Sequence, residues 1–371
     1  MECRRQLDPA GCSPAGCALK RGLAVWILLA CCCLVSYAQS SPATQDLLER
    51  INQLSSRADW QDVVNLSEAS GISTLHSAEL DYYYGMALAR LGRWHEAARA
   101  FQAGIRLNPD DVRFPLELAG IAFKQKNYSR AAAHLHRALK LDPDNSYANE
   151  FLATVYFLQG NLEAALKYWN RIGKPQIENV LTDPKPRVDP VLLDRAFAFA
   201  PASTLGLAEL VATKKRLGAL GIFPTYRFEL AARENSKFDV IFRSQERNGW
   251  ASNTLQALVG VFRGLPYQTV YPEYFNLRNE AINFESMVRW DAQKRRLDAS
   301  FSGPLHRNPK RRYRLGTDLR NENWDIRNSF TGPAPVRGAL NLRREAVNAE
   351  ITSFPNDRLT WSTGAELSHR D

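Results

Sequence analysis

The side chains best suited to metal or acid-base chemistry are histidines, and the sequence contains six of them. The closest pair is His134 and His136, two positions apart in a segment that we expect to be helical. Because an α-helix turns once in about 3.6 residues, these two rings point in different directions. A metal pair on a helix needs a spacing of three or four. We therefore predict a surface location for this pair and no metal site.

Thiol chemistry depends on whether the six cysteines remain in the mature chain. They stand at positions 3, 12, 17, 31, 32 and 33, before or within an apolar run from Gly22 to Val35. Basic residues precede this run and the small pair Ser36 and Ala38 follows it, which is typical of a secretory signal peptide. Residues 1–38 are therefore predicted to be a signal peptide, and the mature protein to be exported without cysteine.

The same segment allows a second interpretation. Leu28-Leu29-Ala30-Cys31 resembles a bacterial lipobox, and in that case a lipid would be attached to Cys31. The apolar run is too short for a helix that spans a bilayer, which needs about 20 apolar residues. Both interpretations predict export.

Motifs that would indicate an enzyme are absent from the sequence. It contains no Gly-rich phosphate loop, no zincin motif and no Gly-x-Ser-x-Gly elbow. We expect no catalytic residues, no cofactor and no enzymatic activity. The formal charge of +9 comes partly from the first 38 residues, so the mature chain is moderately basic. That balance permits contact with an anionic membrane surface, and we do not expect nucleic acid as a partner.

Two basic runs, Lys294-Arg295-Arg296 and Lys310-Arg311-Arg312, lie at the ends of expected strands. They can be solvated tips of turns. They can also contact lipid headgroups or lipopolysaccharide phosphates, because arginine makes paired hydrogen bonds with phosphate oxygens. The sequence leaves both interpretations open, and neither requires catalysis.

A period of 34 residues organises the N-terminal part of the mature chain. Small, aromatic and leucine residues recur in four columns: Gly85, Ala119 and Ala153; Trp94, Tyr128 and Leu162; Ala97, Ala131 and Ala165; Phe101, Leu135 and Trp169. Independent columns with one period indicate an internal repeat. The small column lets two helices of a hairpin approach closely, and Asn-Pro-Asp and Asp-Pro-Asp segments separate the hairpins. Stacked hairpins bury the apolar faces that a single hairpin leaves bare.

This pattern resembles the tetratricopeptide repeat family. We predict an all-α solenoid over residues 44–173, with a degenerate repeat at 44–77 and clear repeats at 78–111, 112–145 and 146–173. In that family the first helix of each hairpin lines a concave face, so the resemblance implies a groove that binds a protein or polypeptide. Half-buried core positions are the alternative for each residue. The groove candidates are Tyr82, Met86, Arg90, Arg113, Phe123, Lys124, Tyr147, Glu150 and Phe157.

Residues 174–249 form a second predicted domain, which begins with a proline-rich linker or weak edge strand at Gly173–Pro190. Two helices are expected at Leu192–Phe199 and Leu207–Leu220, followed by strands at Tyr226–Leu230 and Phe238–Phe242. This order resembles a polypeptide-transport-associated (POTRA) domain, a small α+β fold. Its first strand would lie near Ile177–Leu181. A generic small α+β domain is the alternative.

Beyond Trp250 the hydrophobic period changes to two. Apolar and charged residues alternate around Ile282–Ala292, Leu297–Ser302, Tyr313–Arg320 and Val347–Ile351, and again after Leu359. Such strands suit a barrel with lipid outside and water inside, although a soluble sandwich shows the same alternation. We predict that residues 250–371 supply about five or six antiparallel strands of a partial outer-membrane β-barrel.

The last two segments together resemble the BamA/TamA class of outer-membrane assembly factors, partly through Tyr271-Pro272-Glu273-Tyr274 and Arg289-Trp290-Asp291. The resemblance implies a multidomain outer-membrane protein with periplasmic repeats that assembles or translocates a polypeptide client and contacts outer-membrane lipid. Two other functions stay open. One is an exopolysaccharide export porin, with polysaccharide as the partner, and the other is a lipid-anchored periplasmic scaffold.

Overall fold

The computed structural model describes residues 42–234, 237–250, 254–328 and 334–371. The predicted signal peptide and Cys31 lie outside these residues. The chain divides into two compact units, Met1–Ile121 and Ala122–Asp371, and each is described by itself. The division falls inside one helix, α6 (Arg113–Lys124). No helix in the described ranges is long and apolar enough to cross a membrane.

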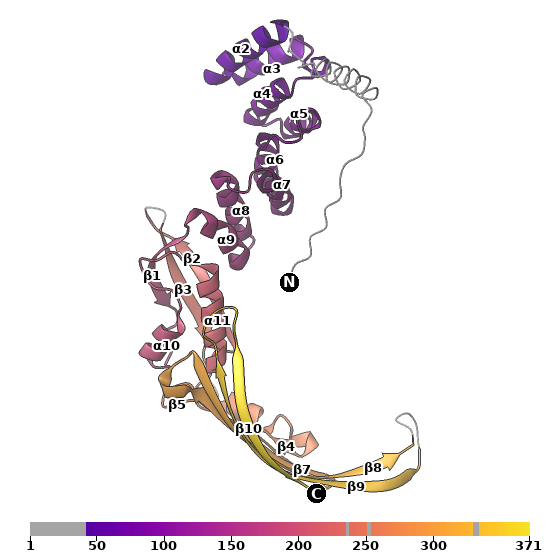
Figure 1. Ribbon diagram of the computed structural model, residues 1–371, viewed down its shortest axis with the longest axis vertical. Coiled ribbons are helices and arrows are strands. Elements are labelled where there is room, and N and C mark those ends of the chain that lie inside the picture. Colours follow the sequence, from indigo (N-terminus) through magenta and orange to yellow (C-terminus); the bar gives the residue numbers. More distant parts are fainter. Residues whose placement is uncertain (1–41, 235–236, 251–253, 329–333) are drawn as a thin grey trace, which may run out of the picture. The chain divides into compact units, whose positions relative to one another are not determined.

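The first unit consists of helical hairpins (Figure 1). Its core contains fully buried leucine, valine and aromatic side chains, among them Leu80, Leu88 and Phe101. Gly85 lies on α4 directly opposite the Phe101 ring of α5, so the small side of one helix receives the aromatic side chain of the next. The helices before α6 are α2 (Pro42–Ser56), α3 (Trp60–Ala69), α4 (Ala78–Arg90) and α5 (Trp94–Leu107).

Helical hairpins continue in the second unit with α7 (Tyr128–Leu141), α8 (Ser146–Leu158) and α9 (Leu162–Trp169). Each of these helices starts at an asparagine whose side-chain oxygen accepts a hydrogen bond from the backbone N–H three residues later. The donor–acceptor distances are 3.1 Å for Asn127, 2.9 Å for Asn145 and 3.0 Å for Asn161. Such caps satisfy amides that lack a partner within the helix. The predicted helical repeat region is confirmed.

A small mixed sheet follows the last repeat helix. Its order is β1-β3-β2, with β1 (Gln176–Thr182) parallel and β2 (Thr225–Ala232) antiparallel to β3 (Lys237–Gln245). The proline-rich segment therefore contributes an edge strand. Two helices, α10 (Pro190–Ala196) and α11 (Leu207–Leu220), come between β1 and β2 in the chain. The sequence predicted both helices and both later strands within a few residues.

An aromatic cluster fills the core of this α+β unit. Phe228 of β2 and Phe242 of β3 are paired in register, and their ring centroids are 5.3 Å apart. Phe197 and Phe199, from the segment after α10, lie against the same rings. Ring pairs at these separations stabilise a core beyond simple burial of apolar area.

The C-terminal part of the second unit is an open antiparallel sheet of seven strands in the order β10-β9-β8-β7-β6-β4, with β5 also paired to β6. The sequence predicted about five or six strands. The additional ones are short: β4 has two residues, and the β5–β6 register is irregular, so neither shows a clear period of two. The strands are β4 (Thr269–Val270), β5 (Glu273–Leu277), β6 (Ile282–Trp290), β7 (Lys294–Pro304), β8 (Arg311–Arg327), β9 (Val336–Ser353) and β10 (Trp361–Arg370).

A further helix, α12 (Thr254–Phe262), precedes this sheet and was not predicted from the sequence. Within the described strands, β10 and β4 stand at the two ends of the order, so these strands do not form a closed barrel. The outer-membrane barrel therefore remains a prediction.

The close approach of α4 to α5 can be tested at Gly85. A Cβ atom there would lie 2.6 Å from the ring of Phe101, which is fully buried and cannot move easily. We expect Gly85→Ala to lower the free energy of unfolding of the repeat helices by about 1–3 kcal/mol. Far-UV circular dichroism during thermal unfolding measures the effect.

Gly120→Ala in α6 is the matched control, because nothing lies within 4 Å of the Cβ position there. Alanine is the better helix former by about 0.5–1 kcal/mol, so this variant should be as stable as the parent protein or more stable. If Gly85→Ala proves equally stabilising, α4 and α5 do not pack as described.

Candidate functional site

Arg113 is the groove candidate of the first unit that makes the most polar contacts. The guanidinium of Arg113 lies 4.5 Å from the centroid of the Tyr82 ring and donates two hydrogen bonds to Glu79, at 3.0 and 2.6 Å. It also bonds to Asp111. The hydrogen bonds to Glu79, and then those to Asp111, raise the pKa of Arg113 above its usual range. These contacts hold the cation against an aromatic ring at the start of α6.

Met86 and Arg90 follow Tyr82 along α4. Tyr82 and Met86 are half-buried and pack against the core of the unit, so they contribute to stability whether or not they also contact a partner. Arg90 is exposed, with its guanidinium 5.7 Å from the Trp60 ring centroid. The structure thus arranges Tyr82, Met86, Arg90 and Arg113 on the first helices of two hairpins, and their role in binding stays a prediction.

In the second unit the aromatic candidates meet at Phe151. The Phe151 ring centroid lies 5.2 Å from that of Phe123 and 5.8 Å from that of Tyr147. Tyr147 is 64% exposed, and Lys124 is exposed beside Phe123. This cluster joins the end of α6 to α8 and presents an aromatic surface to solvent. Sequence analysis missed Phe151, although its place between Tyr147 and Val155 on one face of a helix could have indicated it.

The two remaining candidates are tied to other parts of the second unit. Glu150 forms an ion pair with Lys174 at 2.5 Å, and the Phe157 ring packs against Trp169 with centroids 5.4 Å apart. Both contacts connect α8 to the end of the repeat region. Glu150 is exposed and remains accessible, whereas Phe157 is half-buried and acts at least partly as core.

His136, expected at the surface, is exposed but takes part in a small polar cluster. Its Nε2 lies 2.9 Å from the Tyr156 hydroxyl, and its Nδ1 lies 3.5 Å from that of Tyr168. The two tyrosine rings are stacked with centroids 5.9 Å apart. Desolvation and then the nearby Lys167 lower the pKa of His136, which favours the neutral ring. The described residues contain no group of three side chains suited to holding a metal.

A buried carboxylate lies within the hairpin that α4 and α5 form. Asp81 of α4 is 8% exposed and lines a cavity of about 370 Å³ that Arg99 and Arg106 of α5 also line. Burial raises the pKa of Asp81 to about 6, and the charges of Arg106 and His76 act against that rise. No hydrogen bond or ion pair to its side chain occurs within the described part of the chain. Asp81 therefore costs stability when it is ionised.

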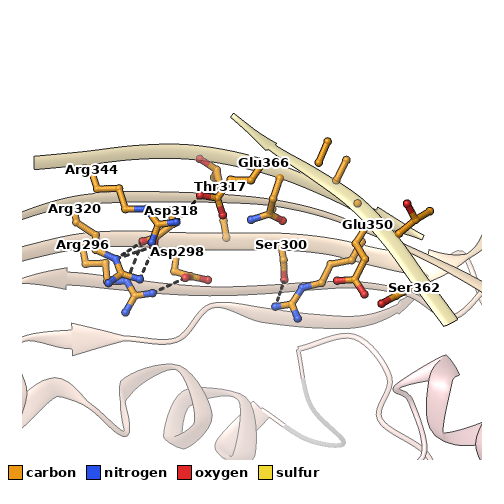
Figure 2. A pocket seen from close by; sticks show the side chains of 18 residues that line it. Arg296, Asp298, Ser300, Thr317, Asp318, Arg320, Arg344, Glu350, Ser362 and Glu366 are labelled. Atoms are coloured by element: carbon orange, nitrogen blue, oxygen red, sulfur yellow. Dashed lines mark hydrogen bonds and ion pairs between the residues drawn. The ribbon is translucent and has the colours of Figure 1, made fainter. Parts of the chain in front are cut away.

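One face of the seven-stranded sheet carries an ion-pair network. Figure 2 shows Arg296, Arg320 and Arg344 converging on Asp318, at 3.0, 2.5 and 3.5 Å. Asp318 is buried. A second ion pair joins Arg344 to Glu366 of β10 at 2.7 Å, so the network crosses four strands. The residues line an open cavity of about 580 Å³ whose positive and negative groups are balanced.

The opposite face of the same sheet is apolar and exposed. Side chains alternate between faces along a strand, so the residues between the charged ones share the other side. Cross-strand partners form apolar rows, such as Leu297 beside Leu319 and Val347 beside Leu367. Val347 is 60% exposed and Leu367 is 83% exposed. The sheet thus reverses the arrangement of a soluble protein, with charges partly buried and apolar groups in contact with solvent.

Comparison with protein families identifies the helical part. Models described as tetratricopeptide repeat match residues 84–135 and 122–176. Residues 84–176 therefore form a tetratricopeptide-repeat region, as the period of 34 residues predicted. A comparison with curated proteins finds no match to the chain.

Solved structures that are similar to this chain match about a third of its length. MamA has 19% sequence identity and a TM-score of 0.33, and the match covers 34% of this chain and 74% of MamA. YrrB, a TPR protein with an unusual peptide-binding site, has 19% identity and a TM-score of 0.32, with 36% and 68% covered. The Yersinia enterocolitica chaperone SycD, in complex with a peptide of the translocator YopD, has 14% identity and a TM-score of 0.31, with 33% and 98% covered.

The buried position of Asp81 predicts a pH dependence. Its folded pKa lies above the unfolded value of about 3.9, so the native state pays for ionisation as the pH rises from about 4 to about 6. Asp81→Asn should therefore raise the stability of α4 and α5 by about 1–3 kcal/mol at neutral pH and leave it unchanged near pH 4. Hydrogen exchange of the full chain, read from peptides of these helices and corrected for intrinsic rates, measures the difference.

Asp46→Asn, at an exposed position of α2, removes the same charge and serves as the control. It should show no comparable gain at neutral pH. An equal effect from both substitutions, or a gain for Asp81→Asn that persists at pH 4, would contradict a cost of burying the Asp81 carboxylate.

Proposed function

We propose that this protein is an exported, non-enzymatic component of a bacterial outer membrane that holds a polypeptide client and helps to assemble or translocate it. The observation that carries the proposal is the seven-stranded sheet, with an exposed apolar face on one side and a buried ion-pair network on the other. Lipid is the environment that favours the first face, and an aqueous lumen is the one that favours the second.

The tetratricopeptide-repeat region would hold the client. Repeats of this kind typically bind peptides or proteins, and stacked hairpins provide an extended surface rather than a closed pocket. Tyr147 and Lys124 are exposed on or beside the aromatic cluster around Phe151 in the second unit. An exposed aromatic surface with a nearby cation suits a polypeptide that has both apolar and acidic side chains.

The mixed sheet would be the POTRA-like connector. Its order of elements, strand, helix, helix, strand, strand, is the one that the resemblance implies, including a first strand that starts at Gln176. β1 and β2 are both edge strands of a three-stranded sheet, and an edge strand offers unpaired backbone groups to an extended chain. The arrangement supports a role in passing a polypeptide by strand addition.

The seven-stranded sheet would belong to an outer-membrane barrel. Barrels of the BamA/TamA class have roughly sixteen strands, so the described strands account for part of one. The exopolysaccharide porin is less well supported, because it would not need a POTRA fold. The proposed activity needs neither metal nor nucleotide.

Lipid contact can be tested at Val347, which faces the apolar side of β9. We expect Val347→Arg to reduce the amount of full-length chain that remains in outer membranes after an alkaline wash. An arginine that faces lipid at the centre of a bilayer costs about 2–4 kcal/mol in a barrel. Quantitative immunoblotting of the washed membranes gives the retained fraction.

Asn348→Arg is the control. Asn348 follows Val347 on β9 and lies on the charged face of the sheet, where Glu350 and Glu366 line the same cavity. The same charge added there should leave retention unchanged. If both variants are retained like the parent chain, the apolar face does not contact lipid and the sheet is better explained as part of a soluble scaffold.

Client binding can be tested at Tyr147. A photo-crosslinking amino acid at this position should give discrete cross-linked polypeptide products in intact cells, because the side chain is exposed beside Phe151. The same amino acid at Arg137, exposed on α7, should not. Equal products from both positions, or none from either, would argue against a client site on the first helices of the hairpins.

A further inference from the structure

A second open cavity, of about 660 Å³, lies within the second unit, Ala122–Asp371. Residues of α10, of the segment that follows it, of α11 and of the turn between β7 and β8 line this cavity. α11 contributes Arg216 and the end of α10 contributes Arg195. Lys310 comes from the turn before β8, and Arg311 is the first residue of β8. His306 adds a fifth nitrogen-bearing side chain. No acidic side chain of the described residues lines this cavity, so its wall carries four formal positive charges.

Arg216 is the least exposed of these cations. It is 7% exposed, and its Nε is buried without a hydrogen-bond partner among the described residues. Burial lowers the pKa of Arg216, because the charged guanidinium has lost its water. A buried charge without a counter-charge is destabilising, so Arg216 is suited to a ligand that supplies the missing negative charge.

Two acidic residues, Asp189 and Glu280, are engaged on the same turn. Both pair with Arg307, which lies between the cavity residues His306 and Asn308. The Nη1 of Arg195 reaches the backbone carbonyl of Arg307 at 3.5 Å. Within the described ranges, none of Arg195, Arg216, Lys310 and Arg311 takes part in an ion pair, whereas most arginines of the strands do. The positive charge of this cavity is therefore available to a ligand.

We propose that this cavity binds a phosphate-bearing anion, held by Arg216 at its buried side and by Lys310 and Arg311 at its rim. Guanidinium groups bind tetrahedral oxyanions through paired, charge-assisted hydrogen bonds, and a lysine ammonium adds a mobile donor. The apolar side chains of Phe197 and Leu305 line the same cavity, so a ligand with an apolar portion can also enter. The phosphate can come from a lipid headgroup or from a soluble phosphorylated compound.

Inorganic phosphate is the first probe, titrated calorimetrically into the purified full chain. We expect saturable binding that Arg216→Met weakens about tenfold, which corresponds to the loss of one charge-assisted contact. Methionine keeps much of the volume and removes the buried charge. Because Arg216 is buried, the double variant Lys310→Met with Arg311→Met provides a second test at exposed positions, and it should weaken binding to a similar extent.

Arg227→Met is the charge-matched control, since the Arg227 side chain is 71% exposed on β2 and does not line the cavity. It should change the phosphate affinity by less than about twofold. Vesicles of phosphatidylcholine with and without phosphatidylglycerol distinguish the two sources. Cavity-dependent binding to the phosphatidylglycerol vesicles assigns a lipid headgroup, and binding of inorganic phosphate alone assigns a soluble ligand. Binding of neither probe, or an equal loss in Arg227→Met, overturns the proposal.

Discussion

Apolar side chains must be removed from water, and each part of this chain meets that requirement differently. A helical hairpin cannot bury its own apolar face, so neighbouring hairpins stack, and the Phe114 ring of α6 lies against Gly104 of α5. The mixed sheet buries its aromatic side chains under two helices. In the seven-stranded sheet, Val347 and Leu367 stay exposed, so the requirement is unmet within the described residues. The proposed outer-membrane location of the C-terminal part rests on that difference.

Buried polar contacts fix the mixed sheet to the seven-stranded sheet within the second unit. The Asn283 amide donates to the Leu220 carbonyl at 2.7 Å, and its oxygen accepts from the Asn276 backbone at 3.1 Å. Glu246 accepts hydrogen bonds from the Val188 backbone and the Asn276 side chain, at 2.9 and 3.0 Å. Buried polar groups need such partners, and their directional bonds allow few alternative arrangements. The cavity lined by Arg216 and Lys310 has its shape because this junction is specific.

The sequence was most informative where contacts are local or periodic. The hairpins could be predicted because Ala97, Ala131 and Ala165 recur in one register, and the strands because polar and apolar residues alternate. Contacts between residues that are far apart in the sequence could not be predicted. Arg216 and Lys310 line one cavity although almost a hundred residues of sequence separate them. The helix α12 is a different case, because Leu255, Leu258, Val259 and Phe262 recur at helical spacing and could have indicated it. The strand β4 was missed because a period of two cannot be seen in two residues, and the five residues of β5 pair irregularly with β6.

The two faces of the C-terminal sheet also constrain its register. Asp318 on β8 is opposite Ala346 on β9, and Thr317 is opposite Val347. A slip of one residue would turn Val347 toward the ion-pair network and expose the partners of Asp318 on the apolar side. Three arginines would then lose their shared carboxylate, which is costly where the charges are partly buried. The network therefore selects one register, and the same register creates the continuous apolar face that a lipid environment would stabilise.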